Sequence, residues 1–425
     1  MKVYKFPKGG ISFSDMEAPE KNSSITAFLP VLSMIPLIQH IGEIVYPLVS
    51  VGDHVKEGQL IGKAKSQGQA NIHAAIPGEI LQSVSWEMIH GMENHAFVVR
   101  LGGEFDKSGR TPYPVQWEDL KPFTLKQLIA EYGVVEMEGS GQPLVEILDE
   151  FIESDTTLVV RCVLDDPWLV ADYAVCRERL DAVVEGSLIV SKAVGVSSII
   201  FAVSHKEKDL GELFLSEIAK HNVNASVVIV GSRYPQKNHR ELSLVLKTYA
   251  RDEGISLGSL LILGPSTLAA VYDAVKLKKP ILERYIAVGG SAVQNPQIMK
   301  VRIGTRLHDI FNECGGFKAE PHSVIIGSPL AGRQAAGLDE PITKTSYAIS
   351  AFLEADNSVM LSCISCGECR MVCPVELDPE TLFKCLRKDM MPKAAKECHG
   401  CGCCDFVCPS RLPLSMVIQS VGYRD

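Results

Sequence analysis

The sequence predicts a multidomain α/β protein that ends in a helical, cysteine-rich module. Three observations carry this prediction: short strands broken by turn residues, then buried strands alternating with helices, then a doubled cysteine run. With 425 residues, the chain is long enough for two to four domains. We expect domains at 1–120, with a barrel over about 40–82, and at 121–282, 283–340 and 341–425.

The composition is that of a soluble globular protein without a nucleic-acid partner. Hydrophobic residues make up 46% of the chain, charged residues 22%, and the net charge is -9. Binding to phosphate backbones needs clustered Lys and Arg, which no stretch supplies. The chain has no run of about 18 apolar residues and no signal-peptide pattern at its start. We expect a cytoplasmic protein that another subunit would hold at a membrane.

Residues 40–82 predict a small barrel of hairpins. Their short alternating strands are broken by Gly-Asp, Glu-Gly and Pro-Gly pairs, which are typical of turns. The pattern resembles the biotinyl/lipoyl-carrier sandwich. A carrier lysine would lie at the hairpin tip near 66–70, where the sequence reads SQGQA. We therefore predict a docking or structural element, not a carrier.

Residues 124–280 predict a Rossmann-like parallel α/β domain. Apolar runs alternate there with helical stretches, which indicates a parallel sheet covered by helices. Binding sites in such folds lie at the carboxyl ends of the strands. The four runs are TLVVRCV (157–163), SSIIFAVS (197–204), ASVVIVGS (225–232) and SLLILGPS (259–266).

Residues 284–332 predict a small β-grasp-like unit of the SLBB type. They read as a strand, a strand followed by a helix, and a further strand. Thr305 is placed to cap the helix, and Gly315 is placed to end it. Residues 341–361 are expected to link this unit to the cysteine-rich module.

The cysteine run predicts two [4Fe-4S] clusters. The pattern C-x2-C-x2-C-x3-C-P occurs twice, and in such repeats the fourth cysteine usually ligates the cluster of the other run. Structural zinc sites usually lack the x3-Cys-Pro tail, and disulfides belong to oxidising compartments. A cluster held by four thiolates has no open iron for a substrate, so the expected role is electron relay. We assign Cys363, Cys366, Cys369 and Cys408 to one cluster, and Cys398, Cys401, Cys404 and Cys373 to the other.

The remaining cysteines are not expected to be ligands. Cys403 breaks the spacing, and Cys385 lies in a predicted helix that Asp378 can cap. Leu382, Leu386 and Met390 would share one face of that helix. Cys162, Cys176 and Cys314 are predicted to be buried small hydrophobic residues.

The domain order and several short motifs resemble the RnfC family of Rnf ion-translocating ferredoxin:NAD oxidoreductases. The resemblance covers nearly the whole chain. It implies a peripheral subunit on the cytoplasmic face of the bacterial inner membrane, which binds NADH and FMN and relays electrons through two clusters toward membrane subunits that move Na+ or H+. The motifs are PLIQHIG (36–42), VGDHVKEGQLIG (51–62), YPQ (234–236), AVYDAV (270–275), VRIGT (301–305) and CPSRLPL (408–414).

The nucleotide-binding loop departs from the family pattern. Over 133–147 the chain keeps Gly133, Gly139, Gly141 and Pro143, but Glu136 and Glu138 replace two expected glycines. Gln142 and Leu144 replace Phe and Thr, and the lysine position falls at Glu146 or Ile147. Bare backbone N–H groups and a nearby cation favour phosphate, whereas carboxylates repel it.

A second family segment, over 161–172, is also altered. Pro167 and Asp172 match the family, and Asp166 and Trp168 are chemically similar to the family residues. Arg161, Leu164 and Asp165 replace an Asn, a Glu and a Cys. The resemblance implies that FMN or NADH would be contacted by Gly133, Gly139, Gly141, Pro143 and Asp166. We nevertheless expect weak nucleotide binding or none, because both segments have changed.

The resulting prediction is an electron-transfer subunit of an Rnf-type complex with two clusters and an altered nucleotide site. A soluble ferredoxin or flavodoxin would then replace NADH as the donor or acceptor. Two alternatives remain open: a soluble flavin-dependent reductase of the cobalamin-reductase type, and an electron-relay scaffold without nucleotide chemistry.

Overall fold

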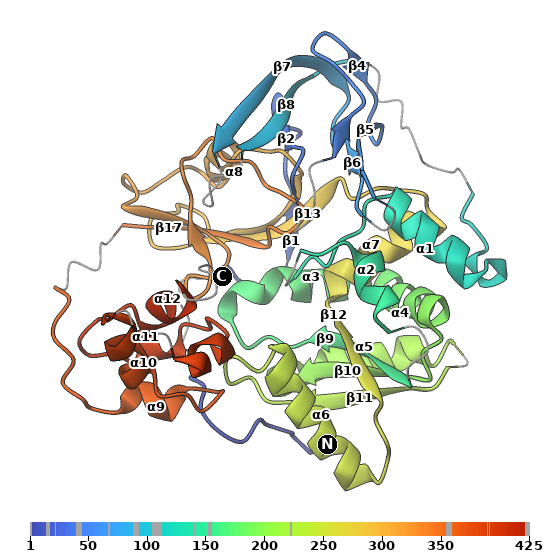
Figure 1. Cartoon of the computed structure of the whole chain (residues 1–425). Helices are drawn as coiled ribbons and strands as arrows, with labels where there is room; N and C mark the ends of the chain where they lie inside the picture. Colours follow the sequence, from blue (N-terminus) through green and yellow to red (C-terminus); the bar gives the residue numbers. More distant parts are fainter. Residues whose placement is uncertain are drawn as a thin grey trace.

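The computed structural model describes the chain in four parts that meet at shared junctions (Figure 1). A barrel lies at the top, a parallel α/β domain at the lower right, a mixed sheet between them at the left, and the cysteine-rich module at the lower left. Among the described residues, no helix is both long and apolar enough to cross a bilayer. The described residues are 2–13, 18–21, 23–39, 45–66, 69–87, 93–103, 113–138, 141–151, 155–221, 223–353, 359–388, 390 and 392–420.

The barrel consists of two antiparallel sheets that enclose a shared core. The first has the strand order β2-β8-β7-β4 and the second β3-β5-β6. The first sheet extends beyond the predicted 40–82, because the long strand β7 is paired along its length with β8 and β8 with β2, whereas the second sheet lies within this range. The strands are β2 (Leu32–Pro36), β3 (Tyr46–Pro47), β4 (His54–Val55), β5 (Leu60–Lys63), β6 (Ile72–His73), β7 (Gly78–Glu87) and β8 (Glu93–Leu101).

The α/β domain is built on a four-stranded parallel sheet with the order β11-β10-β9-β12. Successive apolar residues along each strand point to opposite faces, so the runs recognised in the sequence serve two cores. Leu158, Val160 and Phe201 face the core under α4, α5 and α7, whereas Val159 and Ile200 face α6. The strands are β9 (Thr156–Cys162), β10 (Ser198–Ser204), β11 (Ala225–Val230) and β12 (Ser259–Leu263).

Helices flank this sheet and connect its strands. The α-helices are α1 (Pro122–Glu131), α2 (Leu144–Asp149), α3 (Val170–Glu178), α4 (Leu180–Val194), α5 (Lys208–Ile218), α6 (His239–Glu253) and α7 (Pro265–Lys276). The 3-10 helices are η1 (Trp117–Asp119), η2 (Pro167–Leu169) and η3 (His205–Glu207).

The third part is a mixed sheet with the order β1-β14-β13-β17-β15-β16. Strand β17 lies in the segment expected to be a linker, and it pairs with both β13 and β15. Its apolar residues, including Ile349 and Ala351, complete the core around α8. The elements are β1 (Ser24–Thr26), β13 (Glu283–Gly289), β14 (Gln297–Arg302), α8 (Leu307–Glu313), β15 (Ser323–Ile326), β16 (Arg333–Gln334) and β17 (Ala348–Phe352).

The C-terminal end of α8 agrees with the sequence prediction, whereas its N-terminal end does not. Gly315 follows the helix with a φ of 83°, as expected of a residue that ends a helix. The expected cap by Thr305 is wrong: the N-cap residue is Arg306, and the Thr305 hydroxyl is buried without a hydrogen-bond partner. Thr305 is held instead through its backbone, because its carbonyl oxygen accepts from Ile342 N at 2.9 Å.

The cysteine-rich module is a set of short helices around two cysteine groups. Asp378 caps α10 as predicted, since its carboxylate accepts from Thr381 N at 3.1 Å. Leu382 is buried, but the prediction for Met390 is wrong: the helix ends at Leu386 and Met390 is 49% exposed. The helices are α9 (Glu368–Val372), α10 (Pro379–Leu386), η4 (Lys393–Glu397), α11 (Cys403–Phe406) and α12 (Leu414–Gln419).

Lys344 joins three parts of the molecule through one buried ammonium group. Its Nζ donates to the carbonyl oxygens of Asn71 in the barrel and Gly133 in the α/β domain, both at 2.7 Å. The residue is 2% exposed, and burial lowers the pKa of Lys344 to about 7. The carbonyl groups of Asn71 and Gly133 therefore both accept a hydrogen bond from one lysine that precedes β17.

Replacing Lys344 by Met should destabilise the assembled chain. The methionine has a similar length but leaves the carbonyls of Asn71 and Gly133 without this donor, at a cost of about 2–4 kcal/mol. Chemical denaturation should show a lower midpoint for Lys344→Met, with the exposed Lys318→Met as the control. Equal midpoints for the two variants would contradict the proposed role of Lys344.

Candidate functional site: two cysteine groups and an altered nucleotide loop

The first cysteine group converges on one small cavity. The thiols of Cys363, Cys366, Cys369 and Cys408 all line this cavity. Cys408 comes from the second cysteine run, so the two runs cross over in space. Leu412 and Leu414 complete an apolar wall around these sulfur donors. The donor set and its apolar surroundings suit a [4Fe-4S] cluster, which is held by four thiolates.

The remaining four predicted ligands, the second cysteine group, lie near one another, and one of them, Cys404, also packs in the same cluster as Cys369, Cys363 and Cys408. The Cys398 thiol is close enough to those of Cys401 and Cys373 to interact electrostatically, and Cys404 is close to Cys398 and Cys401. Here Cys373 comes from the first run. Among the described residues, no three His, Cys, Asp or Glu side chains are arranged to hold a single metal ion.

The backbone around both groups is shaped for sulfur ligands. Gly367 and Gly402 have φ values of 81° and 73°, which let the chain turn sharply ahead of α9 and α11. Backbone amides donate to two sulfur atoms: Ser365 N to Cys363 Sγ at 3.4 Å, and Leu377 N to Cys373 Sγ at 3.3 Å. Such N–H donors tune the potentials of iron–sulfur clusters.

Two further cysteines lie near these groups. Cys403 is fully buried against Ile11 and Tyr234, and its thiol is close enough to those of Cys401 and Cys373 to interact electrostatically. Cys385 is half-buried within α10. Neither lines the first cavity.

The second group faces the α/β domain, whereas the first faces outward. Tyr234, just after β11, donates its hydroxyl to the Cys401 carbonyl at 2.9 Å. Arg240 on α6 donates to the Pro374 carbonyl at 3.2 Å. By contrast, Cys366 of the first group is exposed. The module therefore has an inner cysteine group and an outer one.

An N-terminal strap, residues 2–13, holds the inner group against the sheet. Tyr4 extends the sheet by a parallel bridge to Val230 at the end of β11. Farther along, Gly10 N donates to the Val372 carbonyl at 2.8 Å, directly before Cys373. Gly9 packs so closely that a Cβ atom would lie 2.5 Å from the Cys373 carbonyl oxygen.

Replacing Gly9 by Ala should loosen the inner cysteine group. The added methyl group would collide with the Cys373 backbone, and alanine is also strained at a φ of 68°. Gly103→Ala is the matched control, because Gly103 has a φ of 80° but open space around its Cβ position. Iron retained after gel filtration should fall in Gly9→Ala and not in Gly103→Ala. Equal retention would contradict a role of the strap in holding the inner group.

The predicted nucleotide loop is folded against its own domain. Gly133 and Gly141 both have φ values of 70°, and Pro143 forms a bridge with Val135 just before α2. A Cβ at position 133 would lie 2.3 Å from the Asn71 carbonyl oxygen, so Gly133 serves the contact with the barrel. Gly139 lies outside the described residues.

Glu138 occupies the N-terminus of α7. Its carboxylate accepts from Thr267 N at 3.0 Å and from the Thr267 hydroxyl at 2.5 Å. Its three terminal atoms also lie within 2.4–2.8 Å of the position where a Cβ on Gly264 would be. A helix N-terminus with free N–H groups is where this class of fold binds phosphate. Here an internal carboxylate takes that place.

Other charged residues complete this buried network. Glu136 and Glu138 are 6% and 8% exposed, so they do not point to solvent. Arg161 lies 3.7 Å from Glu136, and buried Arg284 donates to the Met137 carbonyl at 3.3 Å. Burial, together with the charge of Glu138, raises the pKa of Asp172 to about 7. A cavity of only about 40 Å³ remains beside Met137 and Ser266.

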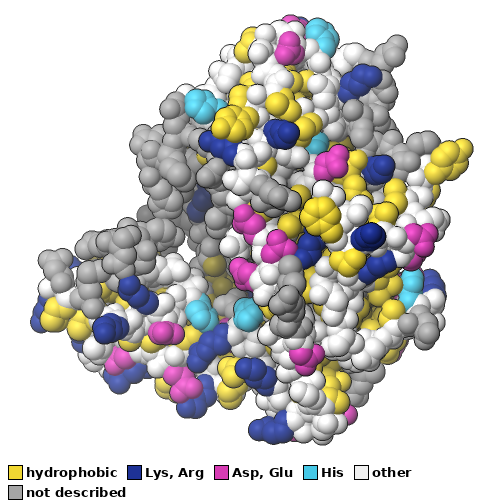
Figure 2. Space-filling model, turned by 45° about the vertical axis from the view of Figure 1, so that its right-hand side comes forward, with side chains coloured by type: hydrophobic (Ala, Val, Ile, Leu, Met, Phe, Trp, Pro, Cys, Tyr) yellow, Lys and Arg dark blue, Asp and Glu magenta, His cyan; other side chains and the backbone are white. Residues whose placement is uncertain are grey.

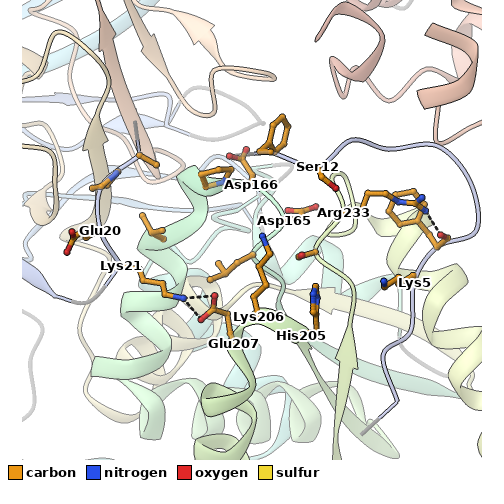
Figure 3. Close-up of a pocket in the computed structure, with 18 of the residues that line it drawn as sticks. Lys5, Ser12, Glu20, Lys21, Asp165, Asp166, His205, Lys206, Glu207 and Arg233 are labelled. Carbon is orange, nitrogen blue, oxygen red and sulfur yellow. Dashed lines mark hydrogen bonds and ion pairs between the residues drawn. The ribbon is translucent and has the colours of Figure 1, made fainter. Parts of the chain in front are cut away.

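A larger cavity of about 1030 Å³ lies at the carboxyl ends of β9, β10 and β11 (Figure 3). Asp165 and Asp166 line it at the end of β9, and Lys206 and Arg233 follow β10 and β11. Asp166 caps η2 by accepting from Trp168 N at 3.0 Å. Burial raises the pKa of Asp165 to about 7.

The strap and residues 18–21 form the other wall of this cavity. Lys5 of the strap and Lys21 line it, and Lys21 pairs with Glu207 at 2.6 Å (Figure 3). The sequence prediction reached Asp166 through the family motif but not the strap residues. The only sequence signal for them was the apolar–basic start of the chain, which does not reveal where the strap packs.

Three family models match consecutive parts of the chain. The RnfC barrel sandwich hybrid domain matches residues 5–104, the Nuo51 FMN-binding domain matches 129–273, and the NQRA C-terminal domain matches 285–337. These matches agree with the barrel, the α/β domain and the mixed sheet of the structure.

Three curated relatives, each a C subunit of an oxidoreductase complex, match over most of their own length. The relative from the proton-translocating ferredoxin:NAD(+) oxidoreductase complex of Clostridium ljungdahlii is 30% identical over 92% of this chain and 86% of the relative. The relative from the ion-translocating oxidoreductase complex of Rhodobacter capsulatus is 30% identical over 87% of this chain and 72% of the relative. The relative from the Na(+)-translocating ferredoxin:NAD(+) oxidoreductase complex of Acetobacterium woodii is 26% identical over 86% of this chain and 83% of the relative.

Among solved structures, the NAD+-reducing [NiFe]-hydrogenase in its H2-reduced state shares the fold. The TM-score is 0.50 at 13% identity, covering 72% of this chain and 63% of that chain. This likeness concerns the arrangement of elements alone.

Proposed function

Because this chain belongs to the RnfC family, the C subunits of ion-translocating ferredoxin:NAD(+) oxidoreductase complexes, we propose that it is the peripheral electron-transfer subunit of such a complex. It relays electrons between a soluble redox partner and the membrane subunits. One observation carries this proposal: four thiols, three from one cysteine run and one from the other, converge on a single cavity at the surface of the cysteine-rich module.

We assign one [4Fe-4S] cluster to each cysteine group. Cys363, Cys366, Cys369 and Cys408 would hold the outer cluster, and Cys373, Cys398, Cys401 and Cys404 the inner one. Such clusters accept and release single electrons without binding a substrate. The chain's own residues keep the two groups in one helical module, direct backbone N–H groups at the sulfur atoms and fasten the inner group to the α/β domain.

The altered loop does not fit the phosphate of FMN or NADH. The amide and hydroxyl of Thr267 at the N-terminus of α7 already donate to Glu138, and both loop glutamates, Glu136 and Glu138, are buried. Each carboxylate about 4 Å from a phosphate costs on the order of 1–4 kcal/mol, depending on screening. The family's FMN-binding domain is therefore retained in this chain as a scaffold, and electrons are exchanged with a protein partner.

We place the chain at the cytoplasmic face of the bacterial inner membrane, where the other subunits of the complex would hold it. Co-expression with those subunits should move the chain into the membrane fraction. Salt-resistant membrane binding of the chain alone would contradict this placement.

The test of the proposed function compares two reductants. Dithionite should bleach the visible absorption of the anaerobically purified chain, because both clusters are reducible. NADH should not do so, with or without added FMN. Rapid bleaching by NADH would show that the nucleotide site works and would overturn the proposed exchange with a protein partner.

A further inference from the structure

Tyr234 connects the N-terminal strap to the inner cysteine group. It is 2% exposed and lies in the loop that follows β11. Its backbone pairs with Ile11 of the strap in both directions, because Ile11 N donates to the Tyr234 carbonyl and Tyr234 N donates to the Ile11 carbonyl, each at 2.9 Å. The cysteine-rich module forms the lobe at the lower left of Figure 2, and Tyr234 is buried where the α/β domain meets this lobe.

The tyrosine ring is held in place on several sides. Its centroid lies 5.3 Å from that of Phe13, and the two ring planes meet at 59°. Phe13 in turn makes an edge contact with Phe406 on α11, with the centroids 5.5 Å apart. Tyr234 and Cys403 belong to one buried cluster, against which Cys401 packs. These contacts fix the direction in which the phenolic hydroxyl points.

The hydroxyl points at a predicted ligand residue of the inner group. It donates to the Cys401 carbonyl at 2.9 Å, so the positive end of the O–H dipole is turned toward this cysteine. A hydrogen bond is electrostatically stronger in a buried site than in water, because the local dielectric constant is low. The outer group has different surroundings, since Cys366 is exposed.

Burial makes reduction of the inner cluster more difficult. Reduction adds one negative charge to this region, and burial disfavours an added charge. Cys373 and Cys404 of the inner group are 9% and 7% exposed. Hydrogen-bond donors near the ligands oppose this effect, because they stabilise the more negative state. The Tyr234 hydroxyl is placed to be such a donor.

We propose that Tyr234 is a positioning residue that raises the reduction potential of the inner cluster by donating its hydroxyl hydrogen to the Cys401 carbonyl. This proposal rests on the proposed function, because it requires a cluster at the inner group. One electron enters the cluster from its reductant, no bond is formed or broken, and Tyr234 keeps its proton. The residue thus offsets part of the cost of burial and keeps the inner cluster within reach of electrons from the outer one.

The test is a redox titration of the full-length chain, followed by EPR spectroscopy after anaerobic reconstitution. The test variant is Tyr234→Phe, which keeps the ring and its packing against Phe13 but removes the hydroxyl. The matched control is Tyr285→Phe, because the Tyr285 hydroxyl also donates a hydrogen bond, to Glu178 at 3.0 Å, outside the cysteine-rich module. The Cys408→Ser variant, which should keep only the inner cluster, identifies the reduction step that belongs to it.

At the wild-type midpoint potential, the ratio of reduced to oxidised inner cluster should fall about three- to tenfold in Tyr234→Phe. A tenfold change corresponds to a shift of about 59 mV for a one-electron couple. The reduction step of the outer cluster and the iron content should stay unchanged, as should both steps in Tyr285→Phe.

An unchanged or higher potential of the inner step in Tyr234→Phe would overturn the role of Tyr234. So would an equal shift of both steps, or a shift of the same size in Tyr285→Phe. Loss of iron from Tyr234→Phe would also overturn it, because the hydroxyl would then hold the module together instead of setting a potential. A wild type without iron and sulfide would instead overturn the proposed function.

Discussion

Replacing Cys408 by Ser should remove the outer cluster and leave the inner one, so that the iron content falls by about half. The reason is geometric: Cys408 belongs by sequence to the second run, but its thiol lines the cavity of the first. By the same crossing, Cys373→Ser should remove the inner cluster. Iron and acid-labile sulfide, measured per chain after anaerobic reconstitution, report both losses.

Double variants identify which cluster each cysteine serves. Cys408→Ser combined with Cys363→Ser should lose no more iron than either single variant, because both residues belong to one cluster. Cys408→Ser combined with Cys398→Ser should lose nearly all the iron. The opposite pattern would mean that the runs do not cross. Cys385→Ser and Cys403→Ser are the controls and should keep both clusters, although Cys403→Ser places a hydroxyl in a buried site.

Removing the two glutamates from the altered loop should create an anion site. In Glu136→Gly/Glu138→Gly, the donors of Thr267 at the start of α7 lose their carboxylate, and Arg161 and Arg284 lose their nearby negative charges. We expect FMN to bind this variant about 10 to 1000 times more tightly than the wild type. Calorimetric titration measures the change, and the gain should shrink as salt is raised.

Glu138→Gln separates charge from shape. Glutamine keeps the length of the side chain and can still accept from Thr267, so it should restore little binding if the site is physically filled. The double variant should also unfold more easily, by about 3–5 kcal/mol, since it breaks buried charge pairs. Stoichiometric FMN on the purified wild-type chain would contradict the whole account of this loop.

Local features of the fold could be predicted from the sequence because their causes are local. The cap by Asp378 and the helix end at Gly315 involve residues within a few positions, and the cysteine spacing is itself a local pattern. Thr305 shows the limit: the residue type suits a cap, but pairing of the next residue with Pro341 shifts the helix start.

Distant contacts explain what could not be predicted. Glu138 and Thr267 are 129 residues apart, and the sequence gives no sign that one would cap the helix of the other. The charge of the two loop glutamates is enough to predict from the sequence that they repel phosphate. Their burial in a charge network can be seen only in the folded structure. In the same way, nothing near Lys344 reveals that the barrel and the α/β domain meet at its ammonium group.

Iron, sulfide and flavin analysis of one anaerobically purified sample of the full-length chain tests the two-cluster assignment and the closed nucleotide site together. We expect about eight irons and eight sulfides per chain, as two [4Fe-4S] clusters require, and no stoichiometric flavin. A colourless, zinc-containing protein after reconstitution would contradict the two-cluster assignment. A brown protein that also carries one FMN per chain would contradict the closed nucleotide site.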